Sequence, residues 1–154
     1  VPEGAPRVVF LGDSLSAGLH LAAEEAFPAE AQRLLADRGL PFQLVNAGIS
    51  GDTTAGGRAR LDWLLRQEPD VVVVELGGND ALRGLPLIQL EANLRDILQR
   101  VRAAGAQPLL LGMDAPASLG PEYARGFSAL YGRLAEELGV GNPSDFFRWE
   151  SHRG

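Results

Sequence analysis

Short apolar runs alternate along the chain with segments of helical periodicity. The runs are rich in valine and leucine, and residues 71–74 are consecutive valines, a pattern typical of a strand covered on both faces of a sheet. Because each run is only a few residues long, we interpret all of them as buried strands rather than helices. The predicted strands are residues 7–11, 42–45, 71–76 and 108–113.

Between these runs, apolar residues recur every three or four positions, which predicts amphipathic helices. Gly39 follows the first of these helices, Pro121 opens the last and Gly139 closes it. This alternation of strands and helices predicts right-handed βαβ units, and therefore an α/β sandwich in which a parallel sheet lies between two layers of helices. The predicted helical stripes are residues 27–35, 58–67, 90–101 and 123–138.

We expect candidate site residues just after the first three strands, because ligands of an open parallel sheet bind at the carboxyl ends of its strands. Ser14 follows the first strand, where its hydroxyl can attack a carbonyl group while its own backbone N–H stabilises the oxyanion. Gly51 follows the second strand and can bring its N–H close to a ligand, because it has no side chain. Asn79 follows the third strand and adds a side-chain donor. Each turn alone is explained by helix capping or a tight turn, but the three together favour a site.

Composition excludes several other classes of protein. The 154 residues suit a single domain, and 14 basic against 20 acidic residues give a net charge of −6, which argues against binding nucleic acid or anionic membranes. All the basic residues are arginines and there is no cysteine, so that lysine-dependent phosphate loops, Schiff bases and thiolate metal sites are excluded. No apolar run approaches the roughly 18 residues of a membrane span. Asp13, Asp52 and Asp80 are interpreted as capping residues rather than metal ligands.

Three sequence blocks carry a family resemblance: G-D-S-L-S-A-G at 12–18, N-A-G-I-S-G-D-T-T at 46–54 and V-E-L-G-G-N-D at 74–80. Together they resemble the first three blocks of the SGNH (GDSL) hydrolases, and most closely the bacterial thioesterase I, lysophospholipase and arylesterase group. The resemblance implies a flavodoxin-like sheet in the order 2-1-3-4-5, Ser14 as nucleophile, and an oxyanion hole made by the N–H groups of Ser14 and Gly51 and the side chain of Asn79. It also implies a mobile loop at 82–86 beside an acyl pocket, and a small ester, acyl thioester or lysophospholipid as substrate. Neither a metal nor an organic cofactor is implied, and a periplasmic or secreted location is favoured, although residues 1–6 do not read as a signal peptide.

The chain departs from the family pattern at its C-terminal end. The family's fourth block, D-x-x-H, which supplies the general base and its orienting carboxylate, is absent. The residues after Val140 contain no apolar run that predicts the fifth strand, so we expect one domain over residues 1–154 that is truncated or divergent after about residue 140, with the sheet order 2-1-3-4. The predicted strand at 108–113 then lies at the edge of the sheet, where we expect either a homodimer or a cover formed by Phe146, Phe147 and Trp149.

His152 is the candidate general base, with Asp145 or Glu150 to orient it. His20 is disfavoured, because six residues along a helix from Ser14 correspond to a rotation of about 240°. Three alternatives remain open: an esterase that uses His152, a catalytically impaired flavodoxin-like module that binds acyl groups or anions, and an enzyme completed by another chain. They differ in whether Ser14 has a general base. The difference matters because loss of a triad residue leaves only about 10³–10⁴-fold catalysis.

Overall fold

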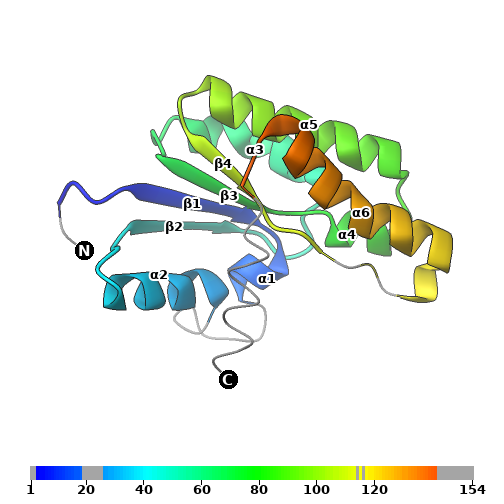
Figure 1. Ribbon diagram of the computed structural model, residues 1–154, viewed down its shortest axis with the longest axis horizontal. Helices are drawn as coiled ribbons and strands as arrows, with labels where there is room; N and C mark the ends of the chain where they lie inside the picture. Colours follow the sequence, from blue (N-terminus) through cyan, green and yellow to red (C-terminus); the bar gives the residue numbers. More distant parts are fainter. Residues whose placement is uncertain (1–2, 19–25, 114, 116, 142–154) are drawn as a thin grey trace.

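A parallel sheet forms the centre of the fold. The computed structural model describes residues 3–18, 26–113, 115 and 117–141 of the chain. In this part of the chain, four parallel strands pair in the order β2-β1-β3-β4 (Figure 1). The predicted α/β class and strand order are confirmed. The strands are β1 (Arg7–Gly12), β2 (Gln43–Gly48), β3 (Val71–Glu75) and β4 (Gln107–Leu110).

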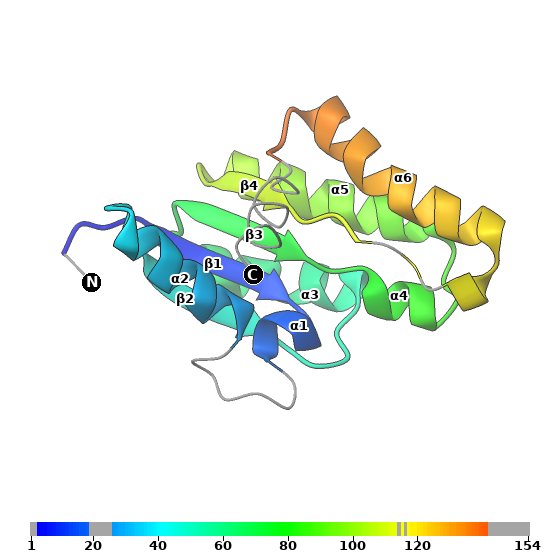
Figure 2. The same cartoon turned by 60° about the horizontal axis from the view of Figure 1, so that its bottom comes forward.

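Helices lie on both faces of the sheet, so that the fold has three layers (Figure 2). α1 and α2 lie on one face, and α3, α5 and α6 lie on the other. The last helix has the predicted ends, because Pro121 opens it and Gly139 follows it in the left-handed region with a φ of 62°. The helices are α1 (Ser14–Ala17), α2 (Phe27–Asp37), α3 (Thr54–Leu65), α4 (Gly78–Leu82), α5 (Leu87–Ala103), α6 (Pro121–Leu138) and the short 3₁₀ helix η2 (Ala117–Leu119). None of the helices in these described ranges is long and apolar enough to cross a membrane.

Alternation along the strands divides the apolar side chains between two cores. On the face of α3, α5 and α6, Val9 and Val72 are fully buried among leucines of the three helices. On the face of α2, Phe10 packs edge-on against Phe27, with ring centroids 5.6 Å apart. The run of valines therefore has a core on each face of the sheet, as predicted.

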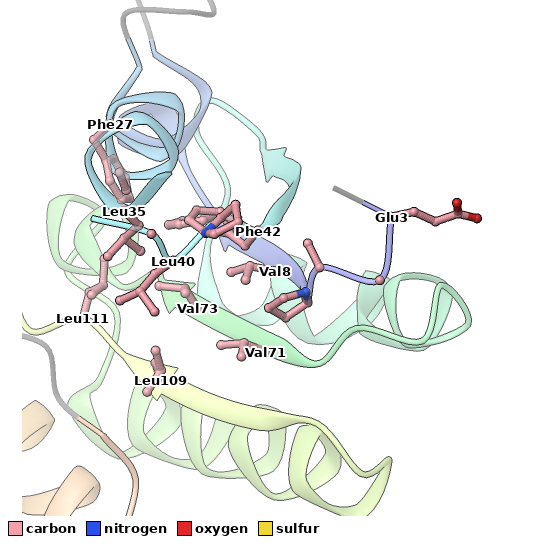
Figure 3. A pocket seen from close by; sticks show the side chains of 17 residues that line it. Glu3, Val8, Phe27, Leu35, Leu40, Phe42, Val71, Val73, Leu109 and Leu111 are labelled. Atoms are coloured by element: carbon pink, nitrogen blue, oxygen red, sulfur yellow. The ribbon is translucent and has the colours of Figure 1, made fainter. Parts of the chain in front are cut away.

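An apolar cavity of about 630 Å³ lies on the α2 face (Figure 3). It is bounded by side chains of the sheet, by α2 and by the segment before β1, including Val73, Leu35 and Pro6. Ser14, Gly51 and Asn79 do not line it. The cavity is therefore a feature of the second core and separate from the turns that carry the candidate chemistry.

β4 is shorter than the predicted strand at 108–113, and its outer side is partly paired. Leu111 donates its N–H to Val74 on the inner side at 3.0 Å, after which the chain leaves the sheet. On the outer side, Leu110 donates its N–H to the carbonyl oxygen of Gly141 at 3.0 Å, where a single parallel bridge joins Leu109 to Gly141. Pro108 has no N–H to donate. The outer side of β4 thus offers no free N–H for pairing with a further strand, which weakens the reason to expect a dimer through this edge.

Two other element boundaries differ from the prediction. α3 begins at Thr54 rather than near residue 58, because the side chain of Thr53 caps it by accepting a hydrogen bond from the N–H of Gly56 at 3.2 Å. Its first turn contains two glycines, which hide the helical pattern in the sequence. β2 runs to Gly48 and ends on the asparagine, alanine and glycine of residues 46–48, so its apolar run marks only its first half.

Candidate active site

The candidate site lies at the carboxyl ends of β1, β2 and β3. The register places Gly12 opposite both Gly48 and Glu75, so the three strands end level with one another. Ser14 follows β1 as the first residue of α1, and Gly51 lies in the loop between β2 and α3. Asn79 lies in α4, directly after β3. Because the strands end level, the three turns meet at one edge of the sheet, as predicted.

The turn that carries Ser14 is held by a buried glutamate. Oε1 of Glu75 accepts hydrogen bonds from Oγ of Ser16 at 2.8 Å, from its N–H at 3.0 Å and from the N–H of Asp13 at 3.3 Å. A Cβ at Gly12 would lie 2.1 Å from Oγ of Ser16, so only glycine allows this close approach. Burial, and after it the neighbouring carboxyl group of Asp13, raises the pKa of Glu75 to about 8.

The turn that carries Gly51 has a left-handed backbone at that residue. Gly51 has a φ of 82° and is exposed, which is a conformation that glycine adopts without strain. Its carbonyl oxygen accepts a hydrogen bond from Nη2 of Arg83 at 3.2 Å, and the next residue, Asp52, donates its N–H to Ile49 at 3.1 Å. Within the described part of the chain, no group accepts the N–H of Gly51. This N–H is therefore available to a ligand.

Asn79 joins the other two turns. Its Nδ2 donates to the carbonyl oxygen of Asp52, the residue after Gly51, at 2.8 Å. The same atom lies 3.5 Å from Oδ2 of Asp13, the residue before Ser14. A carboxamide has two N–H donors, so a ligand can take the second while the first holds Asp52. All three predicted residues are thus brought to one place.

Further polar side chains stabilise these turns, and the sequence did not predict a role in the site for Glu75, Thr54 or Arg60. The carboxylate of Asp80 accepts hydrogen bonds from the N–H of Thr54 at 2.9 Å and from its hydroxyl at 2.7 Å, and both residues are buried. Arg60 pairs with the carboxylate of Asp52. Glu75 had a signal in the sequence, because it is a carboxylate at the end of a buried run of valines. Arg60 had none, since its other partners are backbone carbonyl groups.

The candidate bases lie outside the described residues. This holds for His20 and His152, and for Asp145 and Glu150, which were expected to orient His152. Asp13, Asp52 and Asp80 each have partners within the protein, and in the described ranges no three metal-binding side chains come together.

Comparison with known proteins identifies the family. The family model of the GDSL-like lipases and acylhydrolases matches residues 10–143. The chain belongs to this family. The resemblance read from the three sequence blocks is therefore confirmed, and with it the expected α/β fold.

Two curated members of the GDSL-like family are close relatives. One is the esterase TesA of Pseudomonas aeruginosa, which is 48% identical over 134 residues, covering 86% of this chain and 67% of the relative. The other is the thioesterase 1/protease 1/lysophospholipase L1 of Escherichia coli K12, which is 50% identical over 138 residues, covering 88% of this chain and 64% of the relative. The chain thus spans about two thirds of the length of these relatives.

A solved structure extends the comparison to three dimensions. The crystal structure of AlinE4, an esterase of the SGNH-hydrolase family, superposes with a TM-score of 0.85 at 40% identity. The match covers 92% of this chain and 77% of AlinE4. Nearly the whole chain therefore has its counterpart in a folded SGNH esterase.

Proposed function

We propose that this protein is a serine hydrolase that cleaves carboxylic esters or acyl thioesters through an acyl-enzyme on Ser14. The observation that carries the proposal is the joining of three turns at one edge of the sheet, where Asn79 binds Asp52 at 2.8 Å and lies 3.5 Å from Asp13. This places the residues next to Ser14 and Gly51 around one carboxamide. Membership of the GDSL-like family adds independent support.

The reaction has two steps. Oγ of Ser14 attacks the carbonyl carbon of the substrate and its proton passes to a general base, which then protonates the departing alcohol or thiol. Water attacks the acyl-enzyme in the second step and releases the carboxylic acid and free Ser14. In both steps the negative charge on the former carbonyl oxygen is stabilised by the N–H groups of Ser14 and Gly51 and by the carboxamide of Asn79. Each such donor contributes about 2.7–4 kcal/mol to transition-state stabilisation in serine hydrolases.

His152 is the proposed general base, because the chain has only two histidines and the spacing of His20 from Ser14 disfavours the other. A direct test is the pH profile and rate of ester hydrolysis by the His152→Gln variant. A fall of about 10³-fold or more supports this role. Unchanged hydrolysis removes His152 from the mechanism and leaves a base from another chain as the alternative.

The proposed substrates carry small to medium acyl chains. Support comes from the relatives, one named an esterase and another a thioesterase and lysophospholipase. Hydrolysis of p-nitrophenyl acetate, butyrate and octanoate and of an acyl-coenzyme A thioester measures both chain length and leaving group.

Hydrolysis by the Ser14→Ala variant tests the proposal itself. We expect its rate to fall to the residual about 10³–10⁴-fold above the uncatalysed reaction that loss of a triad residue leaves. Ser118→Ala, a change at an exposed serine of η2, keeps the wild-type rate. An equal rate in wild type and Ser14→Ala refutes the proposal. If the wild type binds acyl compounds without hydrolysing them, the flavodoxin-like binding module is the correct account.

Two further expectations are also proposals. A homodimer through residues 108–113 is tested by light scattering during size-exclusion chromatography, and a monomer at all concentrations contradicts it. The limited hydrogen-bonding capacity of the outer side of β4 favours apolar side-chain contacts over strand pairing in such a dimer. A periplasmic or secreted location is tested by fractionation of the source cells, and recovery only with the cytosol contradicts it.

A further inference from the structure

Arg60 forms hydrogen bonds with three different segments at the edge of the sheet. It projects from α3, and its side chain is only 20% exposed. Nε donates to Oδ2 of Asp52 at 2.9 Å, Nη1 donates to the carbonyl oxygen of Ala47 at 2.5 Å, and Nη2 donates to that of Gly12 at 2.9 Å. Nη2 also lies 2.8 Å from Oδ2 of Asp52, so two nitrogens of the guanidinium group face the same carboxylate oxygen. Ala47 belongs to β2 and Gly12 is the last residue of β1.

Each proposed oxyanion donor is close in the chain, or hydrogen-bonded, to a residue that the guanidinium group of Arg60 contacts. Ser14 follows Gly12 by two residues, and Gly51 is bonded directly to Asp52 in the chain. Asn79 reaches the same residue, since its Nδ2 donates to the carbonyl oxygen of Asp52. A single side chain thus fixes the segments that carry all three donors.

We propose that Arg60 is a positioning residue that sets the relative placement of the donors around the oxyanion. Arg60 acts through Gly12 and Asp52 and is not a catalytic residue, because its described donors are used by Asp52, Ala47 and Gly12. This inference rests on the proposed hydrolase function for its kinetic consequence, whereas its structural part stands on the contacts alone.

The chemistry of the site requires arginine rather than another cation. Three donors of one planar fork are aimed at acceptors that belong to β1, to β2 and to the loop after β2. A lysine at this position has a single ammonium group on a flexible stem, so it can satisfy the charge of Asp52 without holding both carbonyl groups. We therefore expect a lysine to restore the charge and not the geometry.

Two arms test the proposal, with Arg60→Gln and Arg60→Lys compared with a matched control. The control is Arg58→Gln, a change at an exposed arginine of the same helix that binds Asp96 and Asn93 of α5 and none of the three turns. The first arm is amide hydrogen exchange at Ile49 and Asp52. The N–H of Ile49 is bonded to the carbonyl oxygen of Gly12, the acceptor that Arg60 also uses.

The expected result of the first arm is exchange about tenfold faster or more at Ile49 and Asp52 in both Arg60 variants. Amides in the middle of α5 and the Arg58→Gln variant should exchange as in the wild type. If Arg60→Gln does not fold, Arg60→Lys and Asp52→Asn give the same readout. Exchange at wild-type rates in the folded variants overturns the proposal.

The second arm is the hydrolysis of p-nitrophenyl butyrate. Misplaced donors weaken binding of the transition state more than that of the substrate, so we expect kcat to fall by about 10–100-fold while KM changes little. A rise in KM with unchanged kcat, or full rescue by Arg60→Lys, contradicts the positioning role. If the wild type itself is inactive, the proposed function fails, whereas the exchange arm still decides whether Arg60 positions the turns.

Discussion

We predict that the stability of the protein depends on pH through the buried carboxyl group of Glu75. The side chain is 2% exposed and its Oε1 accepts three hydrogen bonds from the turn that carries Ser14. No hydrogen-bond donor reaches Oε2 within the described part of the chain. Burial and the carboxyl group of Asp13 raise the pKa of Glu75 from its ordinary value of 4.5 to about 8, so Glu75 is protonated in the folded protein at neutral pH.

The sign of the effect on stability follows from the direction of this shift. Because the pKa is higher in the folded than in the unfolded protein, the contribution of Glu75 is fully present below pH 4.5 and is lost as the pH rises through 8. The Glu75→Gln variant keeps an acceptor for Asp13 and Ser16 but cannot ionise. Between pH 5 and pH 9, the free energy of unfolding of the wild type should therefore fall relative to this variant by on the order of 4 kcal/mol.

Urea unfolding of both proteins at pH 5, 6, 7, 8 and 9 measures this difference. Subtracting the two curves removes the titration of all other groups that behave alike in both. Glu136→Gln serves as the control for loss of one negative charge, since Glu136 is exposed on α6. Parallel stability curves for the wild type and Glu75→Gln refute the reasoning, because they mean that Glu75 ionises at the same pH in the folded and unfolded protein.

Three further substitutions test the supports of the site, each by the midpoint of urea unfolding. Thr54→Val keeps the shape of the side chain but removes the hydroxyl that binds the buried carboxylate of Asp80. It should cost about 1.5–3 kcal/mol. Gly77→Ala should cost about 3 kcal/mol or more, since Gly77 has a φ of 126° and a Cβ there would lie 1.8 Å from the hydroxyl of Tyr131. Tyr131→Phe loses the bond to the carbonyl oxygen of Leu76 at 2.7 Å, should cost about 1 kcal/mol alone, and should relieve part of the cost of Gly77→Ala in the double variant. Additive costs in the double variant would contradict the clash, and an unchanged midpoint for any single variant would contradict its assigned contact.

The sequence predicted the fold well where one physical signal dominates. The stripe from Tyr123 to Leu138 predicts α6, because a long helix repeats its apolar face many times and has Pro121 and Gly139 at its ends. The order of the strands came from the family resemblance and was confirmed, since periodicity alone does not order the strands of a sheet. The prediction for β4 was too long, because an apolar run shows that residues are buried and not that they pair.

The candidate site, too, was predictable from the sequence only in part. The turns at Ser14, Gly51 and Asn79 were predictable, since parallel strands bring their carboxyl ends together and the turns differ from the apolar runs before them. Arg60 was not predictable, because it acts on carbonyl groups that every residue possesses and that only the folded backbone brings within reach. Asp80 was interpreted as a capping residue, whereas in the fold its carboxylate binds Thr54, which lies 26 residues earlier in the chain.

The most direct test of the account is the reaction of Ser14 with a fluorophosphonate, followed by intact mass spectrometry. A phosphonyl group on the serine resembles the tetrahedral intermediate, so its formation requires both an activated hydroxyl and donors for the oxyanion. We predict one adduct per chain in the wild type and in Ser118→Ala, and none in Ser14→Ala. A folded wild-type protein that gains no adduct, or an adduct that persists in Ser14→Ala, contradicts the proposal that Ser14 is the nucleophile.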